Sequence, residues 1–208
     1  NSTDVDDHIN ALDALIAHLE PIESLSDIDE NKKVISKVMY CLEDDPESIQ
    51  LQRRLSSCLR AILLLSTRLP TENIKDFISP ICDTILNKVT NVCSHLVSII
   101  QEIFTLLMGC DPLKQKNYIK FIFPICVSAL SSRSNEKITS SLKILTSLTE
   151  SLGSLFTSQQ NKELFDKIIE LIEYSQLAST TNLANLAQVW SANATTEMNN
   201  NLIKILIN

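Results

Sequence analysis

Glycine is nearly absent from this sequence, with only Gly109 and Gly153 among 208 residues. A sheet protein of this length needs many tight turns, and tight turns commonly use glycine. Aromatic residues make up only 5% of the chain, whereas leucine, isoleucine and serine are frequent. The length allows one sizeable core, or a run of repeats that share a continuous core. This composition predicts an all-α fold.

Long hydrophobic runs are also missing. The longest candidate, AILLLSTRL at 61–69, is interrupted by Ser66 and Arg68, whereas a transmembrane helix needs about 20 mostly apolar residues. We therefore predict no membrane insertion. The chain begins Asn-Ser-Thr-Asp, with neither the basic nor the apolar segment of a signal peptide. We expect a fragment of a longer protein, so further parts of the function can lie outside it.

Motifs for catalysis and metal binding are lacking. The sequence has three histidines but no H-E-x-x-H, G-x-G-x-x-G, G-K-S/T, G-x-S-x-G or C-x-x-C. The acidic segment EDDPE at 43–47 is explained by one helix that ends, a break at Pro46 and a cap for the next helix at Asp44 or Asp45. Cys93 and His95 are two residues apart, so a helix points them to different faces. We predict no enzyme, no cofactor, no metal and no small-molecule substrate.

The cysteines form no recognisable disulfide or zinc pattern. None has a histidine at ligand spacing, and most lie among valine, leucine and isoleucine, where a free thiol behaves as a small hydrophobe. We predict reduced core thiols and hence a cytoplasmic or nuclear protein. The six are Cys41, Cys58, Cys82, Cys93, Cys110 and Cys126.

Charge is unevenly distributed along the chain, whose net charge is −7. Residues 1–50 carry 13 acidic and 3 basic side chains, a net −10, and the remaining 158 residues carry 12 acidic and 15 basic, a net +3. A protein that binds nucleic acid usually has a strong basic excess, so nucleic acid is not an expected partner. The acidic start is either a solvated face or a contact for a basic partner.

A proline-containing hexamer occurs twice, as FISPIC at 77–82 and FIFPIC at 121–126, an offset of 44 residues. The same offset relates Gly109 to Gly153. One further step of this length before and after the two hexamers reaches apolar segments near 34–42 and 165–169. A recurrence of this length predicts helical-hairpin repeats. Predicted first helices span 31–43, 73–88, 115–131 and 161–175.

Segments with helical periodicity lie between these first helices. In the clearest segment, apolar residues recur at steps of three and four: Ile138, Leu142, Leu145, Leu148, Leu152 and Leu155. Two second helices end at glycine, and there we expect a residue with positive φ. Predicted second helices span 47–69, 91–108 and 135–153, and a further helix spans 4–20. Beyond 178, we predict a weak helix around Trp190 and the start of another at 202–207.

FISPICDTIL at 77–86 and FIFPICVSAL at 121–130 resemble the first helix of a HEAT repeat, and FTLLMG at 104–109 and LTESLG at 148–153 resemble the end of its second helix. The turns 87–93 and 131–138 lack the Asp and Arg that HEAT repeats commonly stack as a ladder, so the resemblance is to a divergent HEAT or HEAT/armadillo repeat. It implies one domain over 1–208, a right-handed α-solenoid of about four hairpins plus an N-terminal helix. The implied units are 1–30, 31–70, 71–113, 114–157 and 158–208.

In HEAT-like stacks the second helices line a concave surface that meets partners. A row of basic side chains on this surface or along the turns would bind an acidic peptide or helix. Alternatively, these basic side chains are solvent-exposed charges that offset the acidic N-terminal region. Trp190 is either a core residue or an exposed anchor. The candidate partner-binding residues are Arg53, Arg54, Arg60, Lys114, Lys116, Lys120, Arg133 and Lys137.

The leading functional hypothesis is a non-catalytic scaffold or adaptor that binds protein partners in a cytosolic or nuclear assembly. One alternative is a fragment of a karyopherin-type nuclear transport receptor, which is built from similar helical pairs. A second alternative is a HEAT domain that associates with tubulin or nucleic acid. The second requires a coherent basic row at the turns, where the sequence supplies only Lys88, Arg133 and Lys137.

Overall fold

The protein is described here by a computed structural model, which covers residues 2–19, 21, 37–38, 40–41, 48–68, 82, 86, 94–174 and 180–207. Over these residues the chain is helical and contains no strand. No described helix is both long and apolar enough to cross a membrane. The helices are α1 (Ser2–Leu19), α3 (Ile49–Arg68), α5 (Ser94–Leu107), α6 (Pro112–Ala129), α7 (Asn135–Leu152), α8 (Ser158–Tyr174), α9 (Thr180–Ser191) and α10 (Thr196–Ile207), with a short 3-10 helix at Gly153–Leu155.

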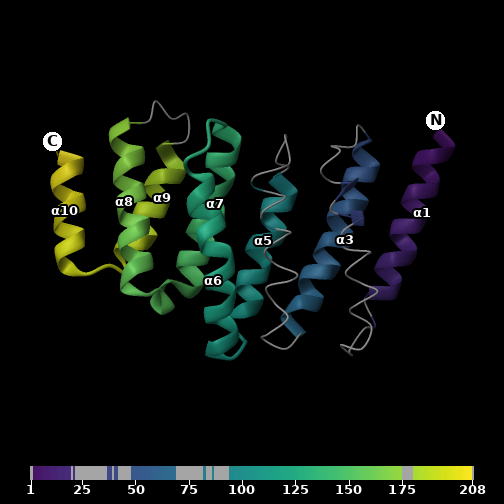
Figure 1. Ribbon diagram of the computed structural model, residues 1–208, viewed down its shortest axis with the longest axis horizontal. Coiled ribbons are helices and arrows are strands. Elements are labelled where there is room, and N and C mark those ends of the chain that lie inside the picture. Colours follow the sequence, from purple (N-terminus) through teal and green to yellow (C-terminus); the bar gives the residue numbers. More distant parts are fainter. Residues whose placement is uncertain are drawn as a thin grey trace.

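Helices α1, α3, α5 and α7 follow one another along the long axis of the molecule (Figure 1), and α9 packs on α7. We call α1, α3, α5, α7 and α9 the helix row, because each contacts the next in this order. The outer helices α6, α8 and α10 lie beside it, and α6 packs on α7 while α8 packs on α9. The α5–α6, α7–α8 and α9–α10 connections lie at the lower end and the α6–α7 connection at the upper end, so α5, α7 and α9 run in one direction and α6, α8 and α10 in the other (Figure 1).

The structure confirms the predicted helices wherever it describes them. The N-terminal helix, the second helices and the last two first helices correspond to α1, α3, α5, α7, α6 and α8 within a few residues at each end. The two weaker predictions near the C-terminus correspond to α9 and α10. The predicted first helices at 31–43 and 73–88 lie almost entirely outside the described residues.

Apolar periodicity explains which faces are buried. The predicted stripe of α7 is buried from Ile138 to Leu152, because helix α7 is contacted by α5, α6 and α9. Along α9, the residues at i, i+3, i+4 and i+7 are buried, namely Leu183, Leu186, Ala187 and Trp190. Side chains at this spacing share one helix face. The row is therefore held together by one continuous apolar core.

The prediction that two glycines end helices with positive φ is wrong. Gly153 caps α7 with φ −59° and ψ −29°, and Gly109 also lies outside the positive-φ region. A Cβ atom on Gly153 would lie 2.9 Å from Asn193 Nδ2, a residue of the turn between α9 and α10. The absence of a side chain at Gly153 therefore permits close packing against that turn.

Side-chain caps begin several helices. Ser134 Oγ accepts a hydrogen bond from the Lys137 backbone N–H at 3.4 Å at the start of α7, as the serine and asparagine near this start predict. At the start of α3, Ser48 Oγ accepts from the Leu51 N–H at 3.3 Å. The cap of α3 is thus Ser48 rather than either of the aspartates that the sequence suggested.

Candidate partner-binding surfaces

A series of polar contacts joins the helices of the row. Between α1 and α3, Arg54 Nε lies 3.3 Å from Asp13 Oδ1. Between α3 and α5, Arg60 forms a two-point ion pair with Glu102, in which Nε donates to Oε2 at 2.8 Å. In both contacts, an arginine of α3 pairs with a carboxylate of the neighbouring helix in the row.

The series continues between α5 and α7. Gln101 Nε2 donates to Ser147 Oγ at 2.8 Å and to the Lys143 carbonyl oxygen at 3.3 Å. The paired residues are separated by 42 residues for Arg60 and Glu102 and by 46 for Gln101 and Ser147, which is close to the repeat offset of the sequence. Each interface from α1 to α7 therefore includes at least one polar contact between residues about one repeat apart.

The ion pair between Arg60 and Glu102 is a surface interaction, because both side chains are close to half exposed. The hydrogen bond between the two side chains holds the pKa of the Glu102 carboxyl below its usual value. The same hydrogen bond raises the pKa of the Arg60 guanidinium. Exposed ion pairs of this kind contribute up to about 1 kcal/mol each to stability. These links therefore align the helices more than they stabilise them.

Of the three predicted arginines on α3, two are engaged in these links. Arg54 and Arg60 are paired with Asp13 and Glu102, whereas Arg53 is exposed and no described carboxylate pairs with it. The acidic partners Asp13 and Glu102 are not among the residues predicted from the sequence. The sequence feature that could have predicted these pairs is an opposite charge about one repeat away from each arginine, because stacked repeats place such residues side by side.

The turn between α5 and α6 is held by side chains at both helix ends. Asp111 Oδ1 accepts from the backbone N–H groups of Leu113 and Lys114, each at 3.0 Å. Gln115 Nε2 reaches back and donates to the carbonyl oxygens of Leu107 at 2.9 Å and Cys110 at 3.0 Å. Both groups satisfy backbone atoms that helix ends leave without intrahelical partners. The geometry of this turn is therefore fixed.

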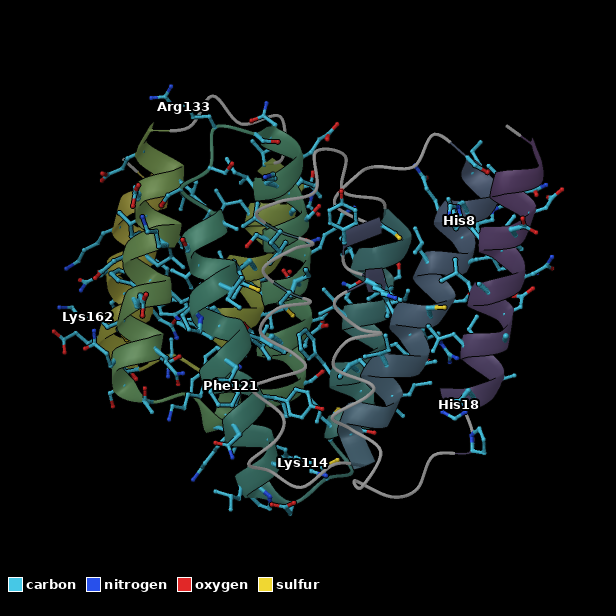
Figure 2. The ribbon with its side chains drawn as sticks, turned by 45° about the vertical axis from the view of Figure 1, so that its right-hand side comes forward. His8, His18, Lys114, Phe121, Arg133 and Lys162 are labelled. Carbon is cyan, nitrogen blue, oxygen red and sulfur yellow. The ribbon has the colours of Figure 1, made fainter. Side chains whose placement is uncertain are left out.

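Lys114 ties this turn to the preceding part of the helix row. Its Nζ donates to the Thr67 carbonyl oxygen at 2.6 Å, in the last turn of α3, where the helix dipole favours a cation. Figure 2 places Lys114 at the lower end of the molecule. Lys114, one of the lysines predicted to bind a partner, therefore also makes a contact within the protein.

Exposed apolar and basic side chains occur at the end of α5, in the turn after it and along the first half of α6. Leu106, Met108 and Leu113 are 42%, 59% and 63% exposed, and exposed apolar residues that form a patch mark candidate interaction sites. Lys116 and Lys120 are exposed and follow Leu113 at steps of three and four along α6. No described carboxylate pairs with either lysine. We call these five residues the α5–α6 edge.

The remaining predicted residues lie away from this edge. Arg133 is exposed in the turn after α6, at the upper end of the molecule (Figure 2), and Lys137 lies in the first turn of α7. Because α6 has 18 residues, its two ends are about 27 Å apart. The structure thus places the eight candidates in three groups rather than in one row.

No three His, Cys, Asp or Glu side chains come together as a metal site within the described part of the chain. The five described cysteines are free thiols. Cys58 Sγ donates to the Leu12 carbonyl oxygen at 3.5 Å between α1 and α3, and burial raises its pKa to about 12. Burial also raises the pKa of Cys126 well above its ordinary value. A thiol must ionise to react as a nucleophile, so these two are inert.

Thiol alkylation of the native protein is expected to follow exposure. Iodoacetamide at about pH 8 should modify exposed Cys41 first and half-buried Cys110 more slowly, because only accessible thiolates react. Cys58, Cys82 and Cys126 should be modified only after denaturation. Peptide mass spectrometry over a time course checks this order. Equal native rates at Cys41 and Cys58 would contradict a buried, protonated Cys58.

Comparison with known proteins gives no assignment: no protein-family model, no curated protein and no solved structure matches this chain.

Proposed function

We propose that this chain is a non-catalytic scaffold or adaptor, a right-handed solenoid of divergent HEAT-like hairpins that binds protein partners in a cytosolic or nuclear assembly. The proposal is supported by the order of the helix row, in which each helix contacts the next one along the chain. It is also supported by the polar links at about one repeat length between α3, α5 and α7. Such stacks present extended surfaces to partners.

The α5–α6 edge is the proposed partner site, and it is the observation that carries this proposal. Three exposed apolar side chains lie in and on either side of the α5–α6 turn, and two exposed lysines that pair with no described carboxylate follow along α6. Apolar anchors with a basic flank suit an acidic amphipathic peptide or helix, because the anchors supply affinity and the lysines supply orientation. The proposed partner is therefore an acidic segment with two or three large apolar residues.

Charge reversal at the edge is expected to remove partner binding. The double variant K116E/K120E should lose about tenfold or more of the affinity for an acidic partner, since attraction becomes repulsion. Both residues are exposed, so the melting temperature should stay close to that of the wild type. Quantitative affinity purification with the protein as bait measures which partners are lost.

The matched control is K143E/K162E, which reverses two exposed lysines on α7 and α8; Lys162 is marked in Figure 2. The control should retain the partners that K116E/K120E loses. Retention of every partner by K116E/K120E would show that the edge is not the site. The recovered proteins also separate the alternatives, because a transport receptor should recover a nuclear transport GTPase, and the third hypothesis requires tubulin or nucleic acid.

A further inference from the structure

The two methionines that the structure describes differ in exposure. Met108 is 59% exposed in the turn between α5 and α6, whereas Met198 of α10 is partly buried and packs against the core. Met39 lies outside the described residues. Susceptibility to oxidation follows exposure, because a side chain that water reaches is also reached by small oxidants. Of the two described methionines, Met108 is therefore the one that a dissolved oxidant attacks first.

The backbone of the α5–α6 turn holds Met108 at the surface. Its N–H donates to the Phe104 carbonyl oxygen at 3.3 Å, and its own carbonyl oxygen accepts from Gln115 Nε2 at 3.4 Å. The next residue is Gly109, which has no side chain that could cover the thioether. The sulfur of Met108 is therefore accessible in the folded protein, and no unfolding is needed to expose it.

A hydroperoxide oxidises a thioether by transfer of one oxygen atom. The sulfur lone pair forms a bond to one peroxide oxygen, the O–O bond breaks, and the sulfur loses two electrons. With hydrogen peroxide, the proton of the transferred oxygen passes to the leaving oxygen, which departs as water. The product is methionine sulfoxide, and methionine sulfoxide reductases restore the thioether at the expense of two thiols, which become a disulfide. The change is therefore reversible.

Oxidation of Met108 changes the α5–α6 edge rather than the core. Met108 is one of the three exposed apolar side chains of this edge, and the sulfoxide is polar. A polar group that is buried against an apolar residue of a partner loses its hydrogen bonds to water. Oxidation of Met198 would instead place a polar oxygen against the core. Oxidation of Met108 should therefore weaken partner binding and leave the fold intact.

We propose that Met108 is a reversible oxidation site, at which a hydroperoxide releases the partner bound to the α5–α6 edge. This inference rests on the proposed function, because it assigns a regulation to the same site. The modification itself takes place in the free protein and is measured without a partner.

Limited oxidation with hydrogen peroxide tests the site. In the native protein, peptide mass spectrometry should find sulfoxide at Met108 at least about fivefold faster than at Met198, because only Met108 is well exposed. The two rates should become equal in denaturant. Dithiothreitol, added after the peroxide is removed, restores reversibly oxidised thiols and leaves the sulfoxide. The melting temperature of protein oxidised at Met108 should match that of untreated protein. Equal native rates at the two methionines would overturn the inference.

Variants test the release step. Met108→Leu keeps an apolar side chain that peroxide does not oxidise, and Met108→Gln introduces a polar side chain of similar length. Peroxide-treated wild type and untreated M108Q should recover about tenfold less of the partners that K116E/K120E loses. M108L should recover these partners before and after peroxide. The matched control M198L should lose them after peroxide as the wild type does, and a methionine sulfoxide reductase should restore recovery by the treated wild type.

The outcomes separate this inference from the proposed function. Retention of every partner by K116E/K120E would overturn the proposed function and the release step with it. Loss of partners by K116E/K120E but not by the peroxide-treated wild type would overturn this inference alone. Loss of partners by peroxide-treated M108L would assign the effect to a different oxidised residue and would also overturn it.

Discussion

Replacing Trp190 with alanine is expected to lower the free energy of unfolding by about 3–5 kcal/mol, the cost of removing a large buried side chain and leaving a cavity. The indole is fully buried, with 0% exposure. Its ring stacks on that of Phe165, with centroids 5.3 Å apart and an interplanar angle of 27°. Trp190 therefore joins α9 to α8, and its loss affects both helices.

Trp190→Phe separates packing from hydrogen bonding. The indole Nε1 is buried and donates to no described residue, so its removal loses no bond among these residues. Phenylalanine keeps the ring stack and part of the volume, and the expected loss is about 1–2 kcal/mol. Urea unfolding followed by far-UV circular dichroism measures both variants, because tryptophan fluorescence is lost in each.

Equal losses for Trp190→Ala and Trp190→Phe would contradict this explanation, since they would assign the effect to the indole nitrogen rather than to packing. Hydrogen exchange adds a spatial test. In a chain whose elements contact mainly their neighbours, destabilisation should be strongest near the substitution. Amide protection should therefore fall in α8, α9 and α10 more than in α3.

The helices could be predicted from the sequence because they rest on local patterns. The apolar stripe from Ile138 to Leu152 and the proline-containing segment at 121–126 each specify one helix. The structure buries the stripe and, within the segment, Ile122, Phe123 and Cys126. Of the two alternatives for Trp190, a core residue or an exposed anchor, the structure confirms the core residue. These features depend on periodicity within 20 residues, which a sequence displays directly.

The glycine prediction failed because it considered only the local chain. Glycine after a helix commonly adopts positive φ, but Gly153 keeps a helical conformation and is surrounded by Asn193 and Thr149. The close approach of Asn193 comes from the packing of α9 on α7, which brings together residues 40 positions apart. A contact of this kind leaves no local signal.

The sequence names the basic residues of the proposed site but not the arrangement of the side chains around them. Lys116 and Lys120 were identified as a basic cluster, but their apolar neighbours Leu106, Met108 and Leu113 resemble core residues in sequence. Only their exposure distinguishes them. Arg54 and Arg60 were predicted to face a partner, and the structure shows them paired with Asp13 and Glu102. Side-chain pairing across helices depends on register, which charge counts do not supply.

Replacing Pro124 with alanine is expected to raise the free energy of unfolding by about 1–3 kcal/mol. Helix α6 continues through Pro124 from Pro112 to Ala129. Proline lacks the N–H that would bond to the carbonyl of Lys120, and its ring crowds that carbonyl. Alanine restores the bond and is the best helix former. Because Pro124 is exposed, little core packing is lost with the ring.

Ser128→Ala is the matched control, one turn further along the same exposed face of α6. It measures the gain from helix propensity alone, which is about 0.5 kcal/mol. A gain at Pro124 well above this value would mean that the proline weakens α6, and hence that Pro124 does not contribute to stability. Urea unfolding of both variants gives the comparison.

A loss of stability in Pro124→Ala would contradict the expected result. It would mean that the proline shapes α6 to fit against α7, since a proline bend suits a helix that must curve around its neighbour. In that case Cys126, whose carbonyl oxygen accepts from Ser141 of α7, should lose its burial, and its thiol should become reactive towards iodoacetamide in the native variant. Stability and thiol reactivity together therefore decide whether the proline serves packing.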